Sequence, residues 1–234
     1  MQAVILAGGL GTRLLPLTEV VPKPMVLVAG VPYLEHQLRL LARQDIRDVL
    51  LLTGYLGEQI ESCFGQGTRL GLNLTYSRER VPVGTGGALR EARELLSEAF
   101  VLIYGDSYLP IEYKDAYERL IATGAEGVAV VYDNRLEDTS VRNNIDLDQN
   151  GFVIRYEKDS PERLSYVEAG VLAFRRSVIG CMPSEGTCSL EKDVFPKLIR
   201  AHRLAGLVTD QRFYDIGTME RLAVIETVLA HDHH

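Results

Sequence analysis

An apolar run at residues 3–7 leads directly into the glycine-rich loop Gly8-Gly9-Leu10-Gly11-Thr12-Arg13. The run is small or apolar and partly β-branched, which predicts a buried parallel strand. The glycines then let the backbone turn sharply and approach a ligand with no Cβ in the way. Successive N–H groups in such a loop favour anions, and Arg13 and Lys23 add two positive charges. This combination predicts a site for a nucleoside triphosphate.

The glycine loop departs from two common phosphate-binding patterns. A P-loop ends in Gly-Lys-Ser or Gly-Lys-Thr, but here Arg13 follows Gly11-Thr12. A dinucleotide-binding loop needs a further glycine where Leu14 stands. Taken alone, such a loop is also typical of an ordinary turn after a strand. Its interpretation therefore depends on the motifs that follow it.

The composition is that of a folded, acidic protein. The 234 residues suffice for one large α/β domain or two small ones, and 46% of them are apolar. The net charge is −7, and no run of Lys or Arg resembles a nucleic-acid-binding surface. No stretch approaches the roughly 18 apolar residues of a membrane span, and the first residues lack the pattern of a signal peptide. We expect a cytoplasmic protein that binds neither nucleic acid nor membrane.

The cysteines and the terminal histidines predict no metal site. Cys63, Cys181 and Cys188 are odd in number and lack paired metal-ligand spacing, which favours free thiols. The tail His231-Asp232-His233-His234 has two interpretations, adventitious binding of a transition metal or a polar, added or frayed terminus. We favour the polar terminus.

Strand and helix patterns alternate over the first 132 residues. Strands are expected at 3–7, 49–53, 72–76, 100–104 and 128–132, and helices at 33–43, 56–64, 89–96 and 115–122. This order predicts an α/β fold: a Rossmann-like, mostly parallel sheet with helices on both faces. Ligands of such folds bind at the carboxyl ends of the strands.

The second half has a different pattern. Strand-like segments at 144–147, 152–157 and 167–174 are joined by polar turns, which favours an antiparallel or mixed extension of the sheet. Helices are expected at 190–202 and 219–230. No fixed-period repeat and no linker is visible, so we expect one compact domain, 1–234, without a C-terminal β-helix.

The first motif resembles the signature of the sugar-1-phosphate nucleotidylyltransferases. After the glycine loop, Pro16-Leu17-Thr18 and Pro22-Lys23-Pro24-Met25 continue the match through 8–25. The resemblance implies an NTP-binding half at about 1–125 and a sugar-phosphate-binding half at about 126–234. It implies that Arg13 and Lys23 are catalytic and that the nucleotide is bound by Leu6, Ala7, Gly8, Gly9, Gly11 and Thr12.

A second glycine-rich segment, 83–88, resembles the family's nucleobase loop and is preceded by Glu79. The resemblance implies nucleotide contacts from Glu79, Gly84, Thr85, Gly86 and Gly87. A glutamate carboxylate can accept hydrogen bonds from N1 and N2 of guanine, which favours GTP. Glycine and threonine here are equally typical of a helix N-terminus.

Two aspartates stand in motifs that the family associates with a metal. Asp106 follows the strand 100–104 in Tyr104-Gly105-Asp106, and Asp215 lies in the closing segment 213–218. Mg²⁺ prefers carboxylate oxygens together with substrate phosphates and water. The resemblance implies that Asp106 and Asp215 bind Mg²⁺ and that Asp106 also contacts substrate. The two residues lie 109 positions apart (215 − 106), so the sequence does not show that they meet.

A third segment resembles the family's sugar-phosphate site. Tyr156-Glu157-Lys158 and the strand around 166–171 match the family's Glu-Lys-Pro and Asn-Ala-Gly motifs, although Asp159 replaces proline and Glu168 replaces asparagine. The resemblance implies that Lys158 holds the sugar 1-phosphate, with the sugar contacted by Glu157, Glu168 and Gly170. The two departures leave the identity of the sugar open.

The resemblance, which covers 2 to about 225, implies an enzyme of nucleotide-sugar synthesis that converts an NTP and a sugar 1-phosphate into an NDP-sugar and pyrophosphate. It is nearest to bacterial mannose- and heptose-1-phosphate guanylyltransferases, which supply cell-surface polysaccharides, and these enzymes are often homo-oligomers. Transfer of a uridylyl or thymidylyl group remains open. So does transfer of a cytidylyl group to a small phosphate such as phosphocholine, or nucleotide binding without turnover, because one fold serves several functions.

Overall fold

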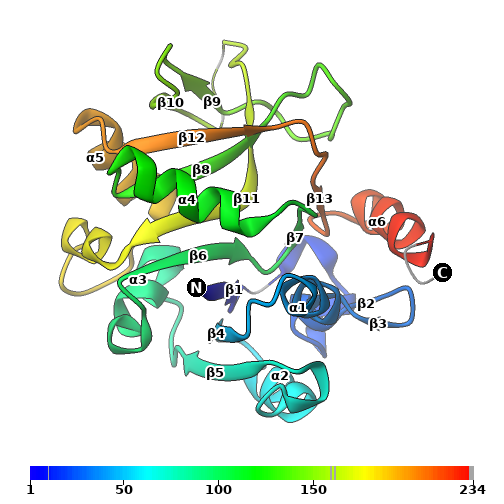
Figure 1. Ribbon diagram of the computed structural model, residues 1–234. Coiled ribbons are helices and arrows are strands. Elements are labelled where there is room, and N and C mark those ends of the chain that lie inside the picture. The colour runs from blue at the N-terminus through cyan, green and yellow to red at the C-terminus, as the bar shows by residue number, and fades with distance from the viewer. Residues whose placement is uncertain (10, 159, 161, 232–234) are drawn as a thin grey trace.

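A computed structural model describes residues 1–9, 11–158, 160 and 162–231 of the chain. Its centre is a seven-stranded sheet with the order β12-β8-β11-β6-β1-β4-β5 (Figure 1). Strand β11 runs antiparallel to both of its neighbours, and the other pairs are parallel. The expected mixed, mostly parallel sheet is confirmed. Its strands are β1 (Gln2–Ala7), β4 (Asp48–Thr53), β5 (Asn73–Arg78), β6 (Ala99–Tyr104), β8 (Gly127–Tyr132), β11 (Val167–Arg175) and β12 (Leu204–Thr209).

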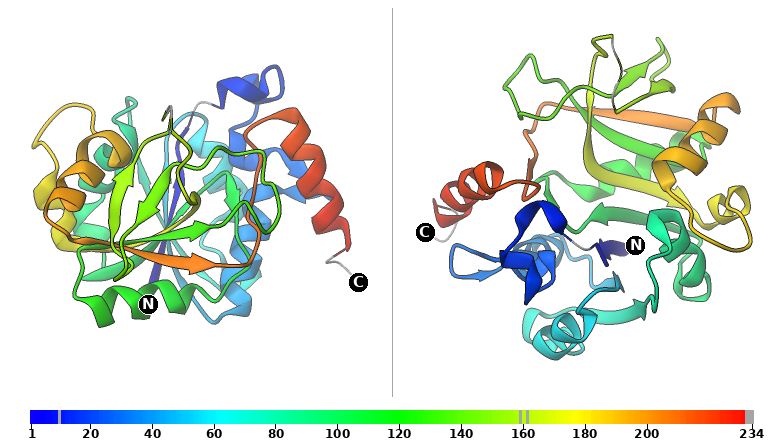
Figure 2. Two further views of the ribbon diagram at one scale, coloured as in Figure 1. Left: turned by 90° about the horizontal axis from the view of Figure 1, so that it is seen from above. Right: turned by 180° about the vertical axis from the view of Figure 1, so that it is seen from behind.

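Helices cover both faces of this sheet, because alternate residues of each central strand point to opposite sides. In β6, for example, Val101 and Ile103 belong to one apolar cluster and Phe100 and Leu102 to the other. Helices α1, α2, α4 and α6 contribute to the first cluster and α3 and α5 to the second, and Figure 2 shows the ribbon from two further sides, with helices around the central sheet. Their bounds are α1 (Tyr33–Arg43), α2 (Gly57–Phe64), α3 (Gly84–Glu91), α4 (Tyr113–Thr123), α5 (Phe195–Arg200) and α6 (Met219–His231).

Short elements complete the chain. Three strand pairs lie outside the main sheet: β2 (Leu27–Val28) with β3 (Val31–Pro32), β9 (Ile145–Leu147) with β10 (Val153–Tyr156), and β7 (Ser107–Tyr108) with β13 (Tyr214–Asp215). Six 3₁₀ helices and one π-helix, η7, join these elements, namely η1 (Thr12–Leu14), η2 (Leu17–Glu19), η3 (Lys23–Met25), η4 (Thr68–Leu70), η5 (Arg93–Leu95), η6 (Arg176–Cys181) and η7 (Leu190–Val194).

Several elements differ from the expectations, including the two-residue strands β2, β3, β7 and β13, which were not expected. Helix α3 begins at Gly84 rather than at residue 89, because the carbonyl of Cys188 accepts hydrogen bonds from the amides of Gly86 and Gly87. The helix expected at 190–202 is divided into η7 and α5 and ends at Arg200. Strand β12 was not expected, because its second half is partly exposed, which weakens its pattern.

The sheet draws strands from both halves of the chain, since β11 lies between β6 and β8. The division near residue 125, between an NTP-binding half and a sugar-phosphate-binding half, therefore concerns only the predicted roles of the two halves. These roles stay predictions. Cys63, Cys181 and Cys188 are free thiols, as expected. Over the described ranges, no helix is both long and apolar enough to cross a membrane. The interpretation of residues 231–234 as a polar terminus stays a prediction, because the residues after His231 lie outside the described part of the chain.

Candidate active site

A cavity of about 430 Å³ opens at the carboxyl ends of β1, β4 and β6. These parallel strands end at the same edge of the sheet, where folds of this kind bind ligands. The cavity is lined by Leu6, Ala7, Gly8, Gly9, Lys23, Pro24, Leu52, Glu79, Pro82, Gly84, Thr85, Ala88, Tyr104, Gly105, Asp106, Lys158 and Glu191. Seven segments of the chain thus contribute to one cavity, namely 6–9, 23–24, 52, 79–88, 104–106, 158 and 191.

The first glycine loop lies along this wall with its backbone exposed to the cavity. A Cβ on Gly8 would lie 3.0 Å from Oε1 of Glu79 and 3.3 Å from the amide of Gly54, whereas Gly9 has open space around it. The amide of Gly105 donates to the carbonyl of Leu6 over 3.0 Å, which fixes the loop beside the end of β6. A ligand in the cavity can therefore approach the backbone of Gly8 and Gly9 closely, because these residues have no side chain.

The end of this loop turns away from the cavity. Gly11 has a φ of +65°, and its carbonyl accepts hydrogen bonds from the hydroxyl of Thr18 and the amide of Leu14. Thr12 and Arg13 are exposed and do not line the cavity. The predicted roles of Gly11, Thr12 and Arg13 stay predictions, and they would require a triphosphate that extends beyond the cavity mouth.

Lys23 and Asp106 form an ion pair inside the cavity. The Lys23 Nζ lies 2.5 Å from Oδ2 of Asp106, and their side chains are 11% and 32% exposed. Lys23 begins η3 directly after Pro22, which places it beneath the glycine loop. The backbone carbonyl of Asp106 accepts a hydrogen bond from the hydroxyl of Tyr33, so α1 supports the same position. Sequence motifs separated by 83 residues here supply a cation and an anion to one site.

The pair β7–β13 brings the second aspartate to the first. Asp215 stands opposite Ser107 in the ladder, and the amide of Ile216 donates to the carbonyl of Asp106 over 3.0 Å. Burial raises the pKa of Tyr33, and the negative charges of Asp106 and Asp215 raise it further, which places both carboxylates near that ring. The structure thus brings together two residues that the sequence could not show to be neighbours.

Each aspartate already has a cationic partner. Both carboxylate oxygens of Asp215 lie within 3.2 Å of Nη1 of Arg221, and Oδ1 also accepts from the amide of Gly217. Asp215 lines a second cavity of about 390 Å³ beside α6 and not the first one. A metal between the two aspartates would therefore have to compete with Lys23 and Arg221 for their oxygens.

The donor set suits a cation completed by its substrate. In the described ranges, no three His, Cys, Asp or Glu side chains gather into a self-contained metal site. Mg²⁺ is commonly bound by one or two carboxylates plus substrate phosphates and water. Asp106, partly exposed at the cavity wall, fits that role, and Asp215 lies on the paired strand.

The second glycine loop divides into a cavity side and a packing side. Gly84 and Thr85 line the cavity. The amides of Gly86 and Gly87 donate to the carbonyl of Cys188 over 2.8 and 3.1 Å, and a Cβ on Gly86 would lie 2.7 Å from the Cys188 sulfur. Gly86 and Gly87 do not line the cavity and their amides are used inside the protein, so their nucleotide contacts stay predictions.

Glu79 lines the cavity beside the two glycine loops. One carboxylate oxygen, Oε2, accepts a hydrogen bond from the amide of Val83 over 3.1 Å. Burial raises the pKa of Glu79, while the Val83 amide and the charge of Glu91 have smaller effects in opposite directions. The carboxyl group is thus held at the cavity wall beside the backbone of Gly8.

Only part of the predicted sugar site lines the cavity. Lys158 lines it, but Glu157, Glu168 and Gly170 do not. Glu157 is 45% exposed and bonds to Arg155, while Glu168 is buried and accepts a hydrogen bond from the amide of Gly170 over 2.7 Å. The direct sugar contacts of Glu157, Glu168 and Gly170 stay predictions. Asp159 lies outside the described residues.

The cavity also contains residues that the motifs did not single out. Glu191, from η7, pairs with Lys158 over 2.7 Å and accepts a hydrogen bond from the hydroxyl of Tyr104 over 3.4 Å. Glu191 lies in a segment that reads as an ordinary amphipathic helix, so periodicity gives no signal for it. Its partner Lys158 is 33 positions away (191 − 158), and only the tertiary structure joins them.

Comparison with protein families matches residues 2–231 to the nucleotidyl transferase family. The mannose-1-phosphate guanylyltransferase catalytic subunit beta of Drosophila melanogaster is 34% identical over 221 residues, with 92% of this chain and 59% of that protein covered. The chain thus spans less than two thirds of that relative. The D-glycero-alpha-D-manno-heptose 1-phosphate guanylyltransferase of Aneurinibacillus thermoaerophilus is 29% identical over 232 residues, with 99% of both chains covered.

A solved structure has the same fold over nearly its whole length. The crystal structure of HddC from Yersinia pseudotuberculosis, complexed with GMP-PN, aligns with a TM-score of 0.82 and 26% identity. The alignment covers 97% of this chain and 99% of the HddC chain. The expected fold is thus found in a solved structure as well as in the topology described above.

Proposed function

This chain belongs to the nucleotidyl transferase family, and on that premise we propose that it couples GTP to a sugar 1-phosphate of the mannose or heptose type. The products are a GDP-sugar and pyrophosphate. The observation that carries this proposal is the cavity itself, which is lined together by bare glycine backbone, Glu79, the Lys23–Asp106 pair and Lys158. The names of the guanylyltransferase relatives support the choice of nucleotide and sugar.

The reaction requires two anions to approach each other. A phosphate oxygen of the sugar 1-phosphate attacks the α-phosphorus of GTP, and the bond from that phosphorus to the β-phosphate oxygen breaks. The attacking oxygen is already ionised at neutral pH, so no general base has to remove a proton. Catalysis then depends on positioning and on neutralising charge.

The cations of the cavity would perform this neutralisation. Lys23 would bond to the α-phosphate and to the incoming phosphate, since an ammonium group carries three donors. Lys158 would hold the sugar phosphate, and the amides of Gly8 and Gly9 would face the β- and γ-phosphates. Arg13 would meet the outer phosphates at the cavity mouth.

We further propose that Asp106 and Asp215 hold Mg²⁺ with the phosphates of the nucleotide. When bound, the ion supplies positive charge where negative charge develops on the phosphates. The two aspartates would orient it and release Lys23 and Arg221 from their present ion pairs. Cytoplasmic location, supply of cell-surface polysaccharides and assembly into a homo-oligomer stay predictions.

The substrates are tested by pyrophosphate release from the purified protein with Mg²⁺. The assay crosses four NTPs with mannose 1-phosphate, a manno-heptose 1-phosphate, glucose 1-phosphate and phosphocholine. Release with GTP and a manno-configured sugar supports the proposal. Release only with UTP or dTTP would move the activity to another nucleotide, and release only with CTP and phosphocholine would indicate the cytidylyl alternative. Nucleotide binding without any release would indicate a non-catalytic protein.

Site-directed variants test the assigned cations and metal ligands. Lys23→Ala and Asp106→Ala are each expected to lower turnover by roughly a hundredfold to a thousandfold, by analogy with the loss of one preorganised charge-stabilising group. Asp215→Ala is expected to lower it similarly, and to shift the Mg²⁺ dependence. The control is Lys114→Ala, a 73% exposed lysine on α4 that pairs with Glu118. Near wild-type turnover in an aspartate variant would remove that residue from the metal site.

A further inference from the structure

A cavity lined by arginines, here called the arginine cavity, lies at the opposite edge of the sheet from the candidate active site. It has a volume of about 610 Å³ and is formed by α3, η5, η6 and the residues that follow η6. Glu98, which lines it, directly precedes β6, whereas Asp106 of the candidate active site follows the carboxyl end of the same strand. Among the described residues, none lines both cavities. The two cavities are therefore separate.

The arginine cavity carries an excess of positive charge. The described residues that line it include three guanidinium groups, those of Arg90, Arg93 and Arg176, and one carboxylate, that of Glu98. The excess is two positive charges (3 − 1), in a chain whose net charge is −7. Local positive charge of this size in an acidic protein favours a small anion.

Backbone carbonyl groups hold the side chain of Arg90. Its Nη1 donates to the carbonyl of Pro183 over 2.9 Å, and its Nη2 donates to the carbonyl of Gly186 over 2.7 Å. Both acceptors are neutral, so these bonds orient the guanidinium group without cancelling its charge. A guanidinium group has five N–H donors, which leaves three donors of Arg90 for a ligand.

The other two arginines can also bind an anion. The Nε of Arg93 lies 3.8 Å from Oε1 of Glu94, which is too far for a hydrogen bond, and both side chains are exposed. Such an ion pair contributes little to stability. The guanidinium group of Arg176 pairs with the carboxylate of Glu98 and donates to the carbonyl of Leu96 over 3.1 Å. Because Glu98 is exposed, Arg176 can exchange it for another anion.

We propose that the arginine cavity binds the phosphate group of a small molecule, as free phosphate or as a phosphate monoester, through Arg90, Arg93 and Arg176. Such a group carries a charge of roughly −1.5 to −2 at neutral pH, which matches the charge excess of the cavity. Guanidinium groups form paired hydrogen bonds with phosphate oxygens. The volume leaves room beyond the phosphate, where Ile179 and Met182 provide an apolar wall. The proposal does not depend on the proposed function, because it concerns other residues and no group transfer.

Calorimetric titration tests this site with inorganic phosphate and with glucose 6-phosphate, at constant ionic strength in chloride. Arg93→Gln is expected to weaken the binding of both roughly tenfold, at the lower end of the range for losing a hydrogen bond to a charged group. Glu98→Gln is expected to strengthen it by at least about threefold, because the change removes a negative charge beside the ligand and releases Arg176. Both side chains are exposed, so both variants are expected to fold, which thermal unfolding verifies.

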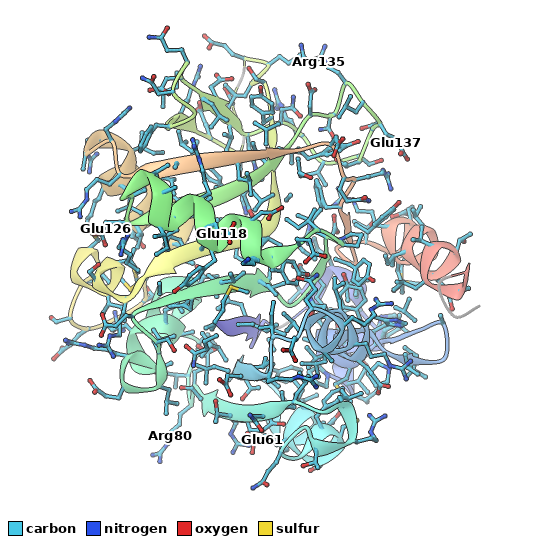
Figure 3. The ribbon with its side chains drawn as sticks, in the orientation of Figure 1. Glu61, Arg80, Glu118, Glu126, Arg135 and Glu137 are labelled. Carbon is cyan, nitrogen blue, oxygen red and sulfur yellow. The ribbon has the colours of Figure 1, made fainter. Side chains whose placement is uncertain are left out.

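The matched controls change exposed, paired charges elsewhere on the surface. Arg135, which pairs with Asp133, follows β8, and Glu118, which pairs with Lys114, lies on α4 (Figure 3). Arg135→Gln and Glu118→Gln are expected to leave both affinities within about twofold, because solvent and salt screen distant surface charges.

Lys158→Ala separates the arginine cavity from the candidate active site, whose cations can also attract phosphate. Weaker binding in Arg93→Gln, together with tighter binding in Glu98→Gln and unchanged binding in Lys158→Ala, supports the proposal. Loss of binding in Lys158→Ala without a change in Arg93→Gln would assign the phosphate to the candidate active site and overturn it. Absence of binding with both probes would overturn it as well. Given support, tighter binding of glucose 6-phosphate identifies a monoester as the ligand, and equal affinities identify free phosphate.

Discussion

The ion pair between Lys23 and Asp106 shows how single residues set the chemistry of the cavity. Lys23 is nearly buried, and an unpaired buried ammonium would be costly. Asp106 offsets that cost without filling the cavity, because its own side chain remains about one third exposed. When phosphates enter, Lys23 can exchange Asp106 for a phosphate or bind both. The ion pair thus keeps a charged lysine at the place where anions are expected to bind.

Glu168 gives a prediction about stability at the same scale. Desolvation is the main cause that raises its pKa from 4.5 to about 8, and the charge of Glu191 adds to it. Between about pH 4.5 and pH 8 the folded protein therefore keeps a proton that the unfolded chain has lost. The contribution of Glu168 to the free energy of unfolding falls as pH rises through this window, and it is constant below and above it.

Glu168→Gln should remove this pH dependence, because the amide mimics the protonated acid and its oxygen can still accept from the amide of Gly170. We expect the variant to gain on the order of 1–3 kcal/mol relative to wild type between pH 4.5 and pH 8. Urea unfolding at several pH values measures the difference. Glu185→Gln is the control, and a constant difference between Glu168→Gln and wild type would contradict the raised pKa.

At the scale of elements, the close contact between β11 and β7 positions the aspartate motif. Gly170 in β11 has a φ of +80°, and a Cβ there would lie 2.3 Å from Cβ and Oγ of Ser107. Ser107 directly follows Asp106 and stands opposite Asp215. Gly170 is therefore needed for packing, because only glycine lets β11 pass so close to β7, and its predicted sugar contact stays a prediction.

Gly170→Ala tests this contact. Gly124, at the end of α4, shares a positive φ of +65° but has no heavy atom within 4 Å of its Cβ position. Alanine is destabilising at both positions because each has a left-handed backbone conformation. The difference in stability between the two variants therefore measures the steric clash with Ser107. We expect Gly170→Ala to be less stable than Gly124→Ala by about 1–3 kcal/mol in urea unfolding. Equal losses would mean that β7 shifts freely, and Asp106 with it.

For the whole molecule, the distribution of charge matters more than its total. The chain carries a net charge of −7, and acidic side chains such as Glu118 and Glu137 lie on the exposed surface (Figure 3). Lys23 and Lys158, in contrast, line the cavity. Each lysine is paired with a carboxylate of the same cavity, Lys23 with Asp106 and Lys158 with Glu191, so it binds an anion by sharing or exchanging that partner. Association with GTP is therefore expected to weaken as salt is added.

Ligand binding should stabilise the whole fold, because the cavity joins segments from both halves of the chain. GTP with Mg²⁺ at about one hundred times its Kd would add about 2.7 kcal/mol to the free energy of unfolding. For a chain of this size that corresponds to a rise in Tm of about 5–11 °C, measured by calorimetry. Chelation of the metal should reduce the rise, and CTP should give a smaller one. Equal shifts with all four NTPs would contradict base recognition by Glu79.

Much of this molecule was predictable from local patterns. The bounds of α1 agree with the expected helix at 33–43, and β1, β4 and β6 lie within one residue of the expected strands. Their signals are strong because a buried parallel strand is uniformly apolar and an amphipathic helix is periodic. The start of α3 depends on the contact with Cys188, which no local pattern contains.

The sequence by itself determined the order of strands and helices, the family motifs, and which charged residues follow the central strands. These depend on neighbours along the chain, where periodicity and glycine spacing act directly. Only the tertiary structure decided which of those charges face one cavity. It placed Lys23, Asp106 and Lys158 there, and it brought in Glu191 from a segment without a motif. Such contacts depend on the direction of side chains and on pairing between distant segments. Both are set only when the strands assemble into the sheet and their carboxyl ends meet at one edge.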